Sequence, residues 1–387
     1  MDSSHYDLIV VGAGVLGTFH AYHAAELDKK VLLLEKDAFP VNATVRNFGQ
    51  IVPSGMANEW FEHGVYSTKL YKKIQSEFDI SIRQNGSIYI ASDDDEQQLI
   101  HELKHRMDER GYEAHLLSKA QCLAKWPVLL SSYCKEGLYF PQEVSAEPNT
   151  LIYKLLFYAT RKFQTLRYQP NTSVWGCEVI KDNVKITTNK GDIYTSDKVI
   201  ICNGHEFSTL FTSIFRNSGI VVSKLNMMRT IPYPDIDLEG NVLTGLTIRR
   251  YESFQDCPSY SKISTPDHLQ ELKKWGIHIL FKKAIDNSII IGDSHEYAPV
   301  DQIEKLGFEL NQEINTVMLK EAARIVQIPN LQIASSWAGF YAQHPDKDVV
   351  EIDIENKIHI RTAIGGKGMT SSGGYAKKSI QQIFESR

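Results

Sequence analysis

The most constraining feature of this sequence is a glycine-rich turn near the N-terminus that lies between two apolar runs. Residues 6–11 form a short apolar run that leads directly into the sequence GAGVLG at residues 12–17. A helix-like segment follows, and a second apolar run over residues 31–34 ends at Glu35. This order predicts a strand, a tight turn, a helix, a second strand and an acid, which is the unit that binds an adenine dinucleotide.

Each chemical feature of that unit has a physical role. Gly12 allows the sharp turn, Gly14 lets backbone amides approach a pyrophosphate, and Gly17 allows close packing of helix on strand. The helix N-terminus stabilises the phosphates. Glu35 is placed to accept hydrogen bonds from ribose hydroxyls, which favours FAD or NAD over NADP. An ordinary βαβ unit with glycines in its turn is the alternative. Three neighbouring residues are expected to contact the same cofactor: Val15, Leu16 and Lys36.

Composition excludes several other classes of protein. The 387 residues include 42 Lys and Arg against 47 Asp and Glu, a net charge of −5, and no sustained basic run, so nucleic acid is not an expected partner. No apolar stretch approaches the roughly 20 residues of a membrane helix. The five cysteines are scattered without CxxC spacing, so neither a disulfide framework nor a cysteine zinc site is expected. These features predict a cytoplasmic protein with reduced thiols.

A second glycine loop, GGKGMTSSGG at residues 365–374, feeds a helix at the far end of the chain. A cofactor domain built from both chain ends explains two such loops better than two consecutive domains do. The predicted fold class is therefore α/β: a Rossmann-like cofactor domain with an interleaved antiparallel-sheet substrate domain. The expected cofactor domain comprises 1–85, 140–215 and 325–387, and the expected substrate domain 86–139 and 216–324.

Several elements within this plan are predicted from periodicity. An antiparallel meander is expected over residues 173–196, followed by a separate buried strand at 198–202. Residues 277–297 are expected to form a hairpin. Residues 220–300 are expected to be rich in strands throughout.

Four motifs stand in a fixed order: GAGVLG with Glu35, VRNFGQ (45–50), KVIICNG (198–204) and GGKGMTSSGG. Together they resemble the FAD-dependent amine and amino-acid oxidoreductases of the glycine oxidase, D-amino-acid oxidase and sarcosine oxidase family. The resemblance spans essentially the whole chain and implies FAD as the cofactor. VRNFGQ, MMRT (227–230), IRRYESF (248–254), GDSHEY (292–297) and GGKGMTSS look like a bacterial subgroup linked to phosphonate breakdown, which implies aminophosphonate substrates.

The resemblance also implies roles for individual residues. Backbone amides of the last glycine loop would meet the pyrimidine end of the flavin, where reduced flavin carries negative charge that a helix N-terminus stabilises. The implied cofactor-binding residues are Arg46, Asn47, Gly49, Val174, Asn203, Gly204, Gly366, Lys367, Gly368, Met369 and Thr370. No Arg directly follows Trp337, where the family often binds a substrate carboxylate. No Cys stands in the last loop and no His in VRNFGQ, so the resemblance implies non-covalent FAD.

The substrate site is predicted from residue chemistry. A phosphonate suits a forked guanidinium, and Arg46, Arg229, Arg249 and Arg250 offer one. If residues 248–251 form a strand, Arg249 and Arg250 point to opposite faces, and we expect Arg250 to face the substrate with Tyr251; a surface arginine is the alternative.

Three further side chains are candidates for the pocket. His295 is expected to accept a proton from the substrate ammonium or to bond its anion, with a structural histidine as the alternative. Trp337 and Tyr341 are expected to line the pocket wall, although aromatic residues at such spacing are also typical of a core. The histidines His20, His23, His101 and His105 lack further ligand partners in the sequence, so no metal site is expected.

The predicted function is oxidation of a small primary or secondary amine by hydride transfer to flavin, with hydrolysis of the imine. Oxygen or another acceptor would reoxidise the flavin, and the oligomeric state stays open. Three alternatives remain: a 2-hydroxy-acid dehydrogenase on the same scaffold, a non-catalytic flavin-binding protein, and an NAD-linked dehydrogenase.

Overall fold

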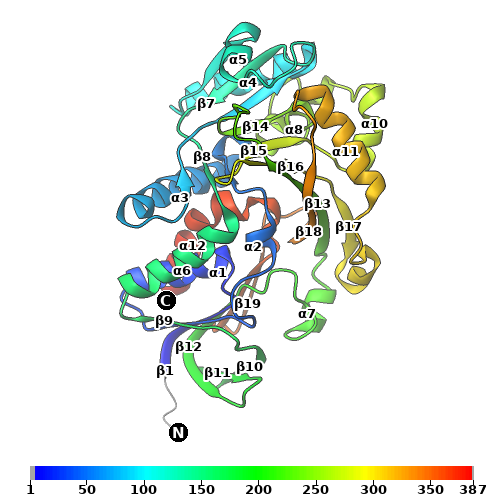
Figure 1. Cartoon of the computed structure of the whole chain (residues 1–387). Helices are drawn as coiled ribbons and strands as arrows, with labels where there is room; N and C mark the ends of the chain where they lie inside the picture. The colour runs from blue at the N-terminus through cyan, green and yellow to red at the C-terminus, as the bar shows by residue number, and fades with distance from the viewer. Residues whose placement is uncertain (1–4, 386–387) are drawn as a thin grey trace.

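The computed structural model describes residues 5–385, which form two large mixed sheets with helices between them (Figure 1). The first sheet has eight strands. They are β1 (His5–Val11), β2 (Val31–Leu34), β9 (Leu166–Gln169), β10 (Val174–Ile180), β11 (Asn183–Thr188), β12 (Ile193–Ile201), β19 (Val350–Ile354) and β20 (Ile358–Thr362).

The N-terminal unit has the predicted βαβ form. β1 and β2 are parallel, with Val10 opposite Leu33, and α1 (Val15–Glu26) connects them. The long strand β12 pairs parallel with β1 over most of its length. The strands expected at 192–196 and 198–202 are therefore one strand: its first half pairs antiparallel with β11, and its second half pairs parallel with β20.

The second sheet has nine strands and is largely antiparallel. It contains β5 (Ser87–Ala91), β6 (His115–Ser118), β7 (Glu136–Phe140), β13 (Val221–Pro232), β14 (Asn241–Leu243), β15 (Leu280–Lys283), β16 (Ser288–Gly292), β17 (Glu296–Pro299) and β18 (Ile333–Gln343). β15 and β16 form the hairpin expected within 277–297. β18 pairs with β13 in this sheet, although residues 325–387 were expected in the cofactor domain. A small third sheet joins β3 (Gln50–Ile51), β4 (Ile82–Arg83) and β8 (Val144–Ala146).

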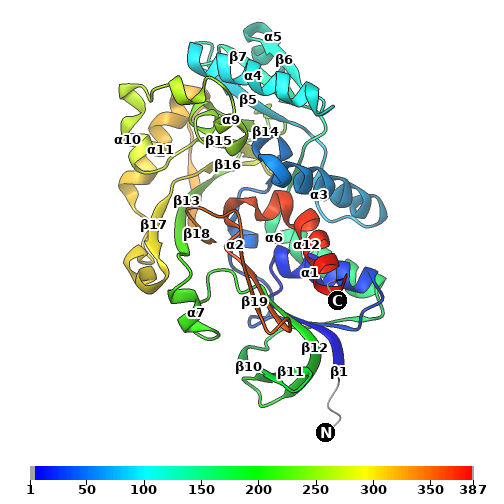
Figure 2. The same cartoon turned by 180° about the vertical axis from the view of Figure 1, so that it is seen from behind.

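Helices from both chain ends pack together between the sheets, as both views show (Figures 1 and 2). α12 (Gly368–Glu385) packs on α1 and on α3 (Asn58–Glu77). His23 Nε2 lies 2.9 Å from the Gly373 carbonyl oxygen, which links α1 to α12. A Cβ at Gly374 would lie 2.5 Å from the His63 carbonyl oxygen, so the glycine allows α12 to approach α3 closely. The glycines of the last motif thus serve helix packing as well as the loop itself.

The remaining helices cover the edges of the molecule. α6 (Pro148–Lys162) lies beside α1, and α4 (Asp94–Glu109) and α5 (Lys119–Lys125) cover the outer end of the second sheet (Figure 1). The others are α2 (Ala43–Arg46), α7 (Thr212–Arg216), α8 (Gly245–Ile248), α9 (Glu252–Gln255), α10 (Gln270–Lys274) and α11 (Gln312–Ile325).

The expectation that residues 248–251 form a strand was wrong. Residues 245–255 form the two short helices α8 and α9, and Arg249 and Arg250 lie in the turn between them. Burial of the Arg249 side chain against the acidic N-terminus of α4 accounts for this turn. The mixed α/β architecture itself confirms the predicted fold class.

No helix within residues 5–385 combines the length and the apolar character required to cross a membrane. All five cysteines lie in the described part of the chain and have free thiols.

Candidate functional site

Three adjoining cavities run from the N-terminal glycine turn to the second sheet. We name them by one lining residue each: the Glu35 cavity of about 130 Å³, the Gly17 cavity of about 110 Å³ and the Arg250 cavity of about 450 Å³. Gly14 and Thr44 line both of the first two cavities. Tyr341 lines both the second and the third. The three cavities therefore form one elongated trench, which is the shape that an extended dinucleotide requires.

The glycines of the first motif are required by close backbone contacts. Gly12 has φ +99°, and a Cβ there would lie 2.2 Å from the Cys202 carbonyl oxygen. A Cβ at Gly17 would lie 1.9 Å from the Gly12 carbonyl oxygen. Only glycine fits either position, so this turn brings β1, β12 and α1 together as the motif predicted.

The Glu35 cavity offers polar groups to a ligand at the end of β2. Glu35 Oε2 accepts a 2.9 Å hydrogen bond from the Ala13 amide, and burial raises the pKa of the carboxyl group although backbone donors oppose that shift. Asn203 Oδ1, on the same cavity, is buried and has no hydrogen-bond partner among the described residues. A buried polar atom without a partner is costly unless a ligand or water completes it. The predicted residues Gly204, Lys36 and Val174 line this cavity as well.

Thr44 is a residue of this trench that the sequence reasoning missed. Its Oγ1 accepts a 3.0 Å hydrogen bond from the Val15 amide, at the N-terminus of α1. A Cβ at Gly14 would lie 3.1 Å from the same oxygen. Thr44 therefore sits where the motif is expected to meet a pyrophosphate, and the only sequence signal for it is its place just before VRNFGQ.

The second glycine loop borders the Gly17 and Arg250 cavities. A Cβ at Gly366 would meet no atom within 4 Å, so this position faces open space rather than protein. Gly368 and Met369 begin α12, and Met369 and Thr370 line the Arg250 cavity. Asn47 and Gly49 of the VRNFGQ segment line the same cavity.

Lys367 has contacts that differ from the expected contact with flavin. Its Nζ lies 2.6 Å from Glu252 Oε1 and 3.1 Å from Asp348 Oδ1. The ammonium group is thus paired with two carboxylates at the rim of the Arg250 cavity, and its direct role toward flavin stays a prediction.

Arg250 presents a cation without an acidic partner to the largest of these three cavities. Its Nη2 donates a 3.0 Å hydrogen bond to Tyr297 Oη, and no acidic partner for it is found within residues 5–385. Arg249 differs completely: its guanidinium is paired with Asp93 at 2.6 Å and with Glu96 at 2.8 Å, and its side chain is only 5% exposed. The two arginines therefore diverge, although they lie in a turn between two short helices and not in a strand.

Two tyrosines line the Arg250 cavity, as predicted for the pocket. Tyr251 Oη accepts a 2.6 Å hydrogen bond from Gln50 Nε2, and burial raises the pKa of Tyr251. Burial likewise raises the pKa of Tyr341. Gln50 Oε1 is buried without a partner among the described residues, which leaves an acceptor at the cavity.

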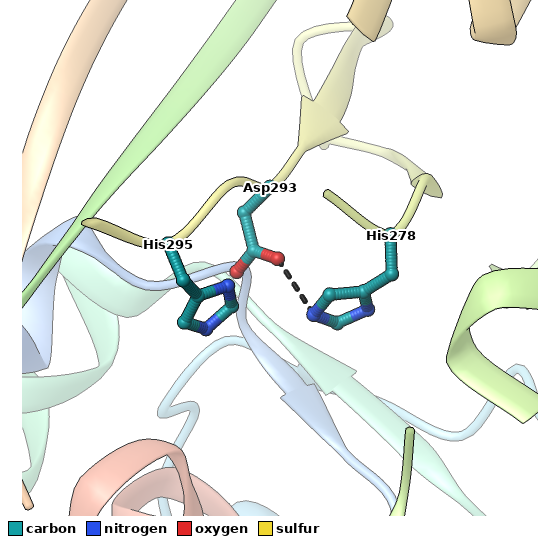
Figure 3. A group of neighbouring side chains, drawn as sticks. All are labelled: His278, Asp293 and His295. Carbon is teal, nitrogen blue, oxygen red and sulfur yellow. Dashed lines mark ion pairs between the residues drawn. The ribbon is translucent and has the colours of Figure 1, made fainter. Parts of the chain in front are cut away.

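His295 stands in a cluster with two residues that the sequence reasoning missed, His278 and Asp293 (Figure 3). His278 Nε2 lies 2.8 Å from Asp293 Oδ1. His295 Nδ1 lies 3.0 Å from the Gly276 carbonyl oxygen, so that nitrogen carries the hydrogen and donates it. The two imidazole rings stack with centroids 5.5 Å apart.

The charge state of this cluster follows from burial and its neighbours. Burial, and secondly the Arg250 cation, lower the pKa of His295 to about 3, so His295 is neutral. Burial opposes ionisation of Asp293, but His278, His295 and Arg250 together hold its pKa below the ordinary value. The cavity wall therefore carries a neutral imidazole beside an ionised carboxylate. One ligand atom from each of the three residues lies within 4.8 Å of the others, a donor set that a divalent cation also accepts.

The hairpin itself was the signal that sequence reasoning could have used to find this cluster. GDSHEY was singled out, but only His295 was taken from it. A hairpin over 277–297 brings its two ends together, and the backbone of His278 pairs with that of Asp293 at 3.0 and 2.9 Å.

Arg46 and Trp337 are not among the described residues that line the three cavities. Arg46 Nε donates to the Val41 carbonyl oxygen at 2.8 Å, and its Nη1 donates to that of Ala338 at 3.3 Å. Trp337 Nε1 donates to the Arg46 carbonyl oxygen at 3.1 Å. These contacts connect α2 to β18, and the expected contact of either side chain with substrate or flavin stays a prediction.

The fold and the trench together define a flavoprotein oxidoreductase of the α/β class. A family model described as FAD dependent oxidoreductase, the DAO family, matches residues 7–381, and this chain therefore belongs to that family. FAD is thus its cofactor, which sets aside the NAD-linked alternative. Every predicted cofactor residue except Arg46 lines the trench, and the buried acceptors of Asn203 and Gln50 and the open face of Gly366 fit such a ligand.

Curated relatives include both alcohol- and amine-oxidising proteins by name. The chain is 25% identical over 379 residues to a glycerol 3-phosphate dehydrogenase of Caloramator mitchellensis, covering 95% of this chain and 70% of the relative. It is 26% identical over 224 residues to monomeric sarcosine oxidase of Bacillus sp. (strain B-0618), covering 55% of this chain and 54% of that one. The chain thus spans only about half the length of the second relative.

Solved structures share the fold across nearly the whole chain. L-proline dehydrogenase from P. horikoshii superposes with a TM-score of 0.81 at 19% identity, covering 99% of this chain and 94% of that one. Glycine oxidase from Geobacillus kaustophilus superposes with a TM-score of 0.78 at 17% identity, covering 99% and 95%. At these identities the likeness establishes the fold alone.

Proposed function

We propose that this protein oxidises a small primary or secondary amine that also carries an anionic group. The observation that carries the proposal is the position of Arg250, an unpaired cation on the same cavity as the second glycine loop. When bound, FAD supplies a hydride acceptor for the substrate carbon. The chain's own residues then have to bind the substrate, orient it and take up a proton.

Arg250 is the residue that we assign to the anionic group. A guanidinium binds phosphonate or carboxylate oxygens through two parallel hydrogen bonds. The existing bond to Tyr297 Oη is to a neutral acceptor, so an anion competes favourably for the same donors. We therefore favour an aminophosphonate such as aminoethylphosphonate or its N-methyl derivative, with amino acids as the wider class.

We assign to His295 the role of accepting a proton from the substrate ammonium group. An amine must lose its ammonium proton before its carbon can release a hydride, because the nitrogen lone pair forms the new C=N bond. Since Nδ1 of His295 donates to Gly276, Nε2 holds a lone pair that accepts this proton. Burial is the larger cause of the low pKa of His295 and persists in the complex, whereas an anion at Arg250 offsets the second cause, the charge of that guanidinium.

The remaining parts of the proposal follow from this chemistry. The imine product hydrolyses to an aldehyde or an oxoacid and releases ammonia or a primary amine. Non-covalent FAD, reoxidation by oxygen or another acceptor, a homo-oligomeric assembly and a cytoplasmic location stay predictions.

Anaerobic flavin reduction tests the proposed function. Purified holoprotein is mixed with amino acids, aminophosphonates, 2-hydroxy acids and glycerol 3-phosphate, and the flavin absorbance is followed. We expect amines that bear an anionic group to bleach it and the matching alcohols to leave it unchanged. If no compound bleaches the flavin, a non-catalytic flavin-binding protein becomes the better description.

Oxidation of an alcohol is the second candidate function. The name of the Caloramator relative favours it, and a neutral histidine beside an anion-binding arginine suits a phosphorylated alcohol or a 2-hydroxy acid as well as an amine. Bleaching by an alcohol and not by its amine analogue would select this candidate.

A further inference from the structure

Asp293 is a buried carboxylate that lines the Arg250 cavity. It is 8% exposed, and its Oδ1 lies 2.8 Å from His278 Nε2. No Lys or Arg within residues 5–385 forms an ion pair with it. Despite this contact, Oδ1 is buried without a hydrogen-bond partner among the described residues, so the carboxylate can still accept hydrogen bonds from a ligand.

His278 holds that carboxylate in place. Its backbone amide donates to the Asp293 carbonyl oxygen at 3.0 Å, and the Asp293 amide donates back at 2.9 Å. Its Nδ1 lies 3.2 Å from Thr247 Oγ1. Because the imidazole is 4% exposed and is held by Thr247 and by the backbone pairing, it fixes the position of the carboxylate beside it.

The carboxylate is ionised in this environment, since His278, His295 and Arg250 outweigh burial in setting its pKa. A buried anion that faces a cavity without a full cationic partner is unfavourable unless a ligand brings the positive charge. The same cavity carries Arg250, which forms no ion pair within residues 5–385 although its charge acts on Asp293. The wall thus presents a cation and an anion that are not in direct contact with each other.

We infer that Asp293 is the counter-ion of the substrate's amine nitrogen, that His278 is its positioning residue, and that the substrate is a zwitterion whose anionic end meets Arg250. The inference rests on the proposed function and extends it to the choice of substrate. Neither a simple alkylamine nor a phosphorylated alcohol neutralises both charges.

The chemistry balances with this assignment. The incoming ammonium binds the Asp293 carboxylate and gives one proton to His295 Nε2, which leaves a neutral amine. Bound FAD would accept the Cα hydrogen with both electrons of the broken C–H bond; the nitrogen lone pair would then form the C=N bond, and the nitrogen would become positively charged. Asp293 is then beside the charge that develops, where a fixed carboxylate stabilises it most.

A divalent cation is the competing occupant of the same three side chains. Arg250 argues against it, because its charge acts on both Asp293 and His295 and repels a dication more strongly than an ammonium. An ammonium also offers three hydrogen-bond donors, which suit a carboxylate oxygen and an imidazole nitrogen.

Binding of two matched ligands separates the amine contact from the anion contact. Dissociation constants of 2-aminoethylphosphonate and of ethylphosphonate, which lacks the amine, are measured by calorimetry on holoprotein of wild type and of Asp293→Asn. We expect wild type to prefer the amine ligand about 30-fold, and Asp293→Asn to lose that preference while ethylphosphonate binding changes less than about threefold. The flavin absorbance spectrum of each protein is recorded to verify that wild type and Asp293→Asn contain equal amounts of FAD.

Two further variants serve as controls. Asp286→Asn removes an acid of the same hairpin that lies outside the three cavities, and we expect it to keep the preference. His278→Gln retains a side-chain N–H that can reach Asp293, whereas His278→Leu does not. We expect His278→Gln to keep most of the preference for the amine ligand and His278→Leu to reduce this preference about tenfold. A purely structural role of His278 would not produce this difference between the two variants.

Each other outcome overturns the inference in a different way. A preference that survives Asp293→Asn removes the carboxylate from the amine site. An equal loss for both ligands makes Asp293 a structural group. Stoichiometric metal in wild type, measured by elemental analysis and absent from Asp293→Asn, replaces the ammonium site by a metal site. If the preference depends on Asp293 but no amine reduces the flavin, the proposed function fails and this binding assignment stands.

Discussion

Two neighbouring arginines show how strongly burial decides the role of a side chain. Arg249 is paired with carboxylates of α4, whereas Arg250 has only a tyrosine hydroxyl as its partner. We expect Arg250→Met to weaken binding of an anionic amine by about 2 kcal/mol, roughly 30-fold in Kd, because the anion loses its guanidinium. FAD affinity should not change. Titration of the amine and of FAD with the purified variant measures both, and unchanged amine binding would remove Arg250 from the substrate site.

Arg249→Met is the matched substitution, with the opposite expected result. It leaves Glu96, whose side chain is fully buried, without its cation. We expect the free energy of unfolding to fall by about 3 kcal/mol, since an unpaired buried charge is left behind. Amine binding at temperatures where the variant is folded should stay normal. Chemical denaturation measures the loss, and a stability equal to wild type would contradict the assigned ion pair.

Glu143 gives the protein a pH-dependent stability. Burial raises its pKa to about 7 from 4.5, and Oε1 accepts a 2.8 Å hydrogen bond from the Ser54 amide. Because the folded-state pKa is the higher one, its contribution is full below pH 4.5 and is lost as pH rises to about 7. The change amounts to about 3 kcal/mol. We expect Glu143→Gln to flatten the melting temperature between pH 5 and about 8 relative to wild type. An unaltered pH profile would show that Glu143 is ionised in the folded protein.

For single residues, the sequence indicated which residue types would line the cavity, but it did not indicate which side chains would contact one another. Arg250, Tyr251, Tyr341 and His295 were chosen by residue type within motifs, and all four line the Arg250 cavity. Asp293, in the same GDSHEY motif as His295, was not among the predicted residues. Only the cross-strand pairing with His278 distinguishes it, and pairing depends on the register of a hairpin that sequence alone leaves open.

The two glycine loops are the elements that the sequence predicted most securely, and they differ physically. In the first loop the glycines are required by backbone contacts; in the second, Gly366 faces open space. We expect Gly366→Val to fold with the stability of wild-type apoprotein yet to lose FAD by tenfold or more, since the side chain projects into the trench. Denaturation of apoprotein and FAD titration check the two halves of this expectation. Full FAD affinity in the variant would place the flavin elsewhere.

Gly17→Ala is the contrasting change. Its Cβ would lie 1.9 Å from the Gly12 carbonyl oxygen, so the helix and the turn must separate. We expect a loss of about 3 kcal/mol or more in the stability of the apoprotein itself, before any cofactor is added. A variant that folds normally and binds FAD would show that α1 can shift without cost.

Elements whose pattern depends on distant partners were predicted less well. β12 reads as two strands because its first half alternates like a meander and its second half is continuously apolar. It is one strand that changes partners from β11 to β20 along its length. The turn at Arg249 likewise depends on Asp93 and Glu96, which lie more than 150 residues earlier in the chain. Local periodicity contains no information about either partner.

The whole molecule joins its two chain ends at one ligand site. Residues 12–17 and 365–370 border the same trench, and α1 packs on α12 beside it. The sequence predicted this closure from two glycine loops at opposite ends. The sequence did not predict that β18, which belongs to the C-terminal segment, pairs with β13 in the second sheet. Strand pairing between distant segments depends on tertiary packing, which local sequence patterns do not reveal.

This arrangement predicts that FAD stabilises the protein as one unit. A ligand that binds only the folded state adds about 4 kcal/mol at a concentration 1,000 times its Kd. Because the ligand contacts both ends of the chain, removal of FAD should loosen residues 12–17 and 365–370 together, while β5 and β7 of the second sheet change little. Hydrogen exchange of holoprotein and apoprotein, compared segment by segment, measures this. Protection confined to the N-terminal loop would mean that the far loop does not hold the cofactor, and the expected contact of the last glycine loop with the flavin ring would then have to be abandoned.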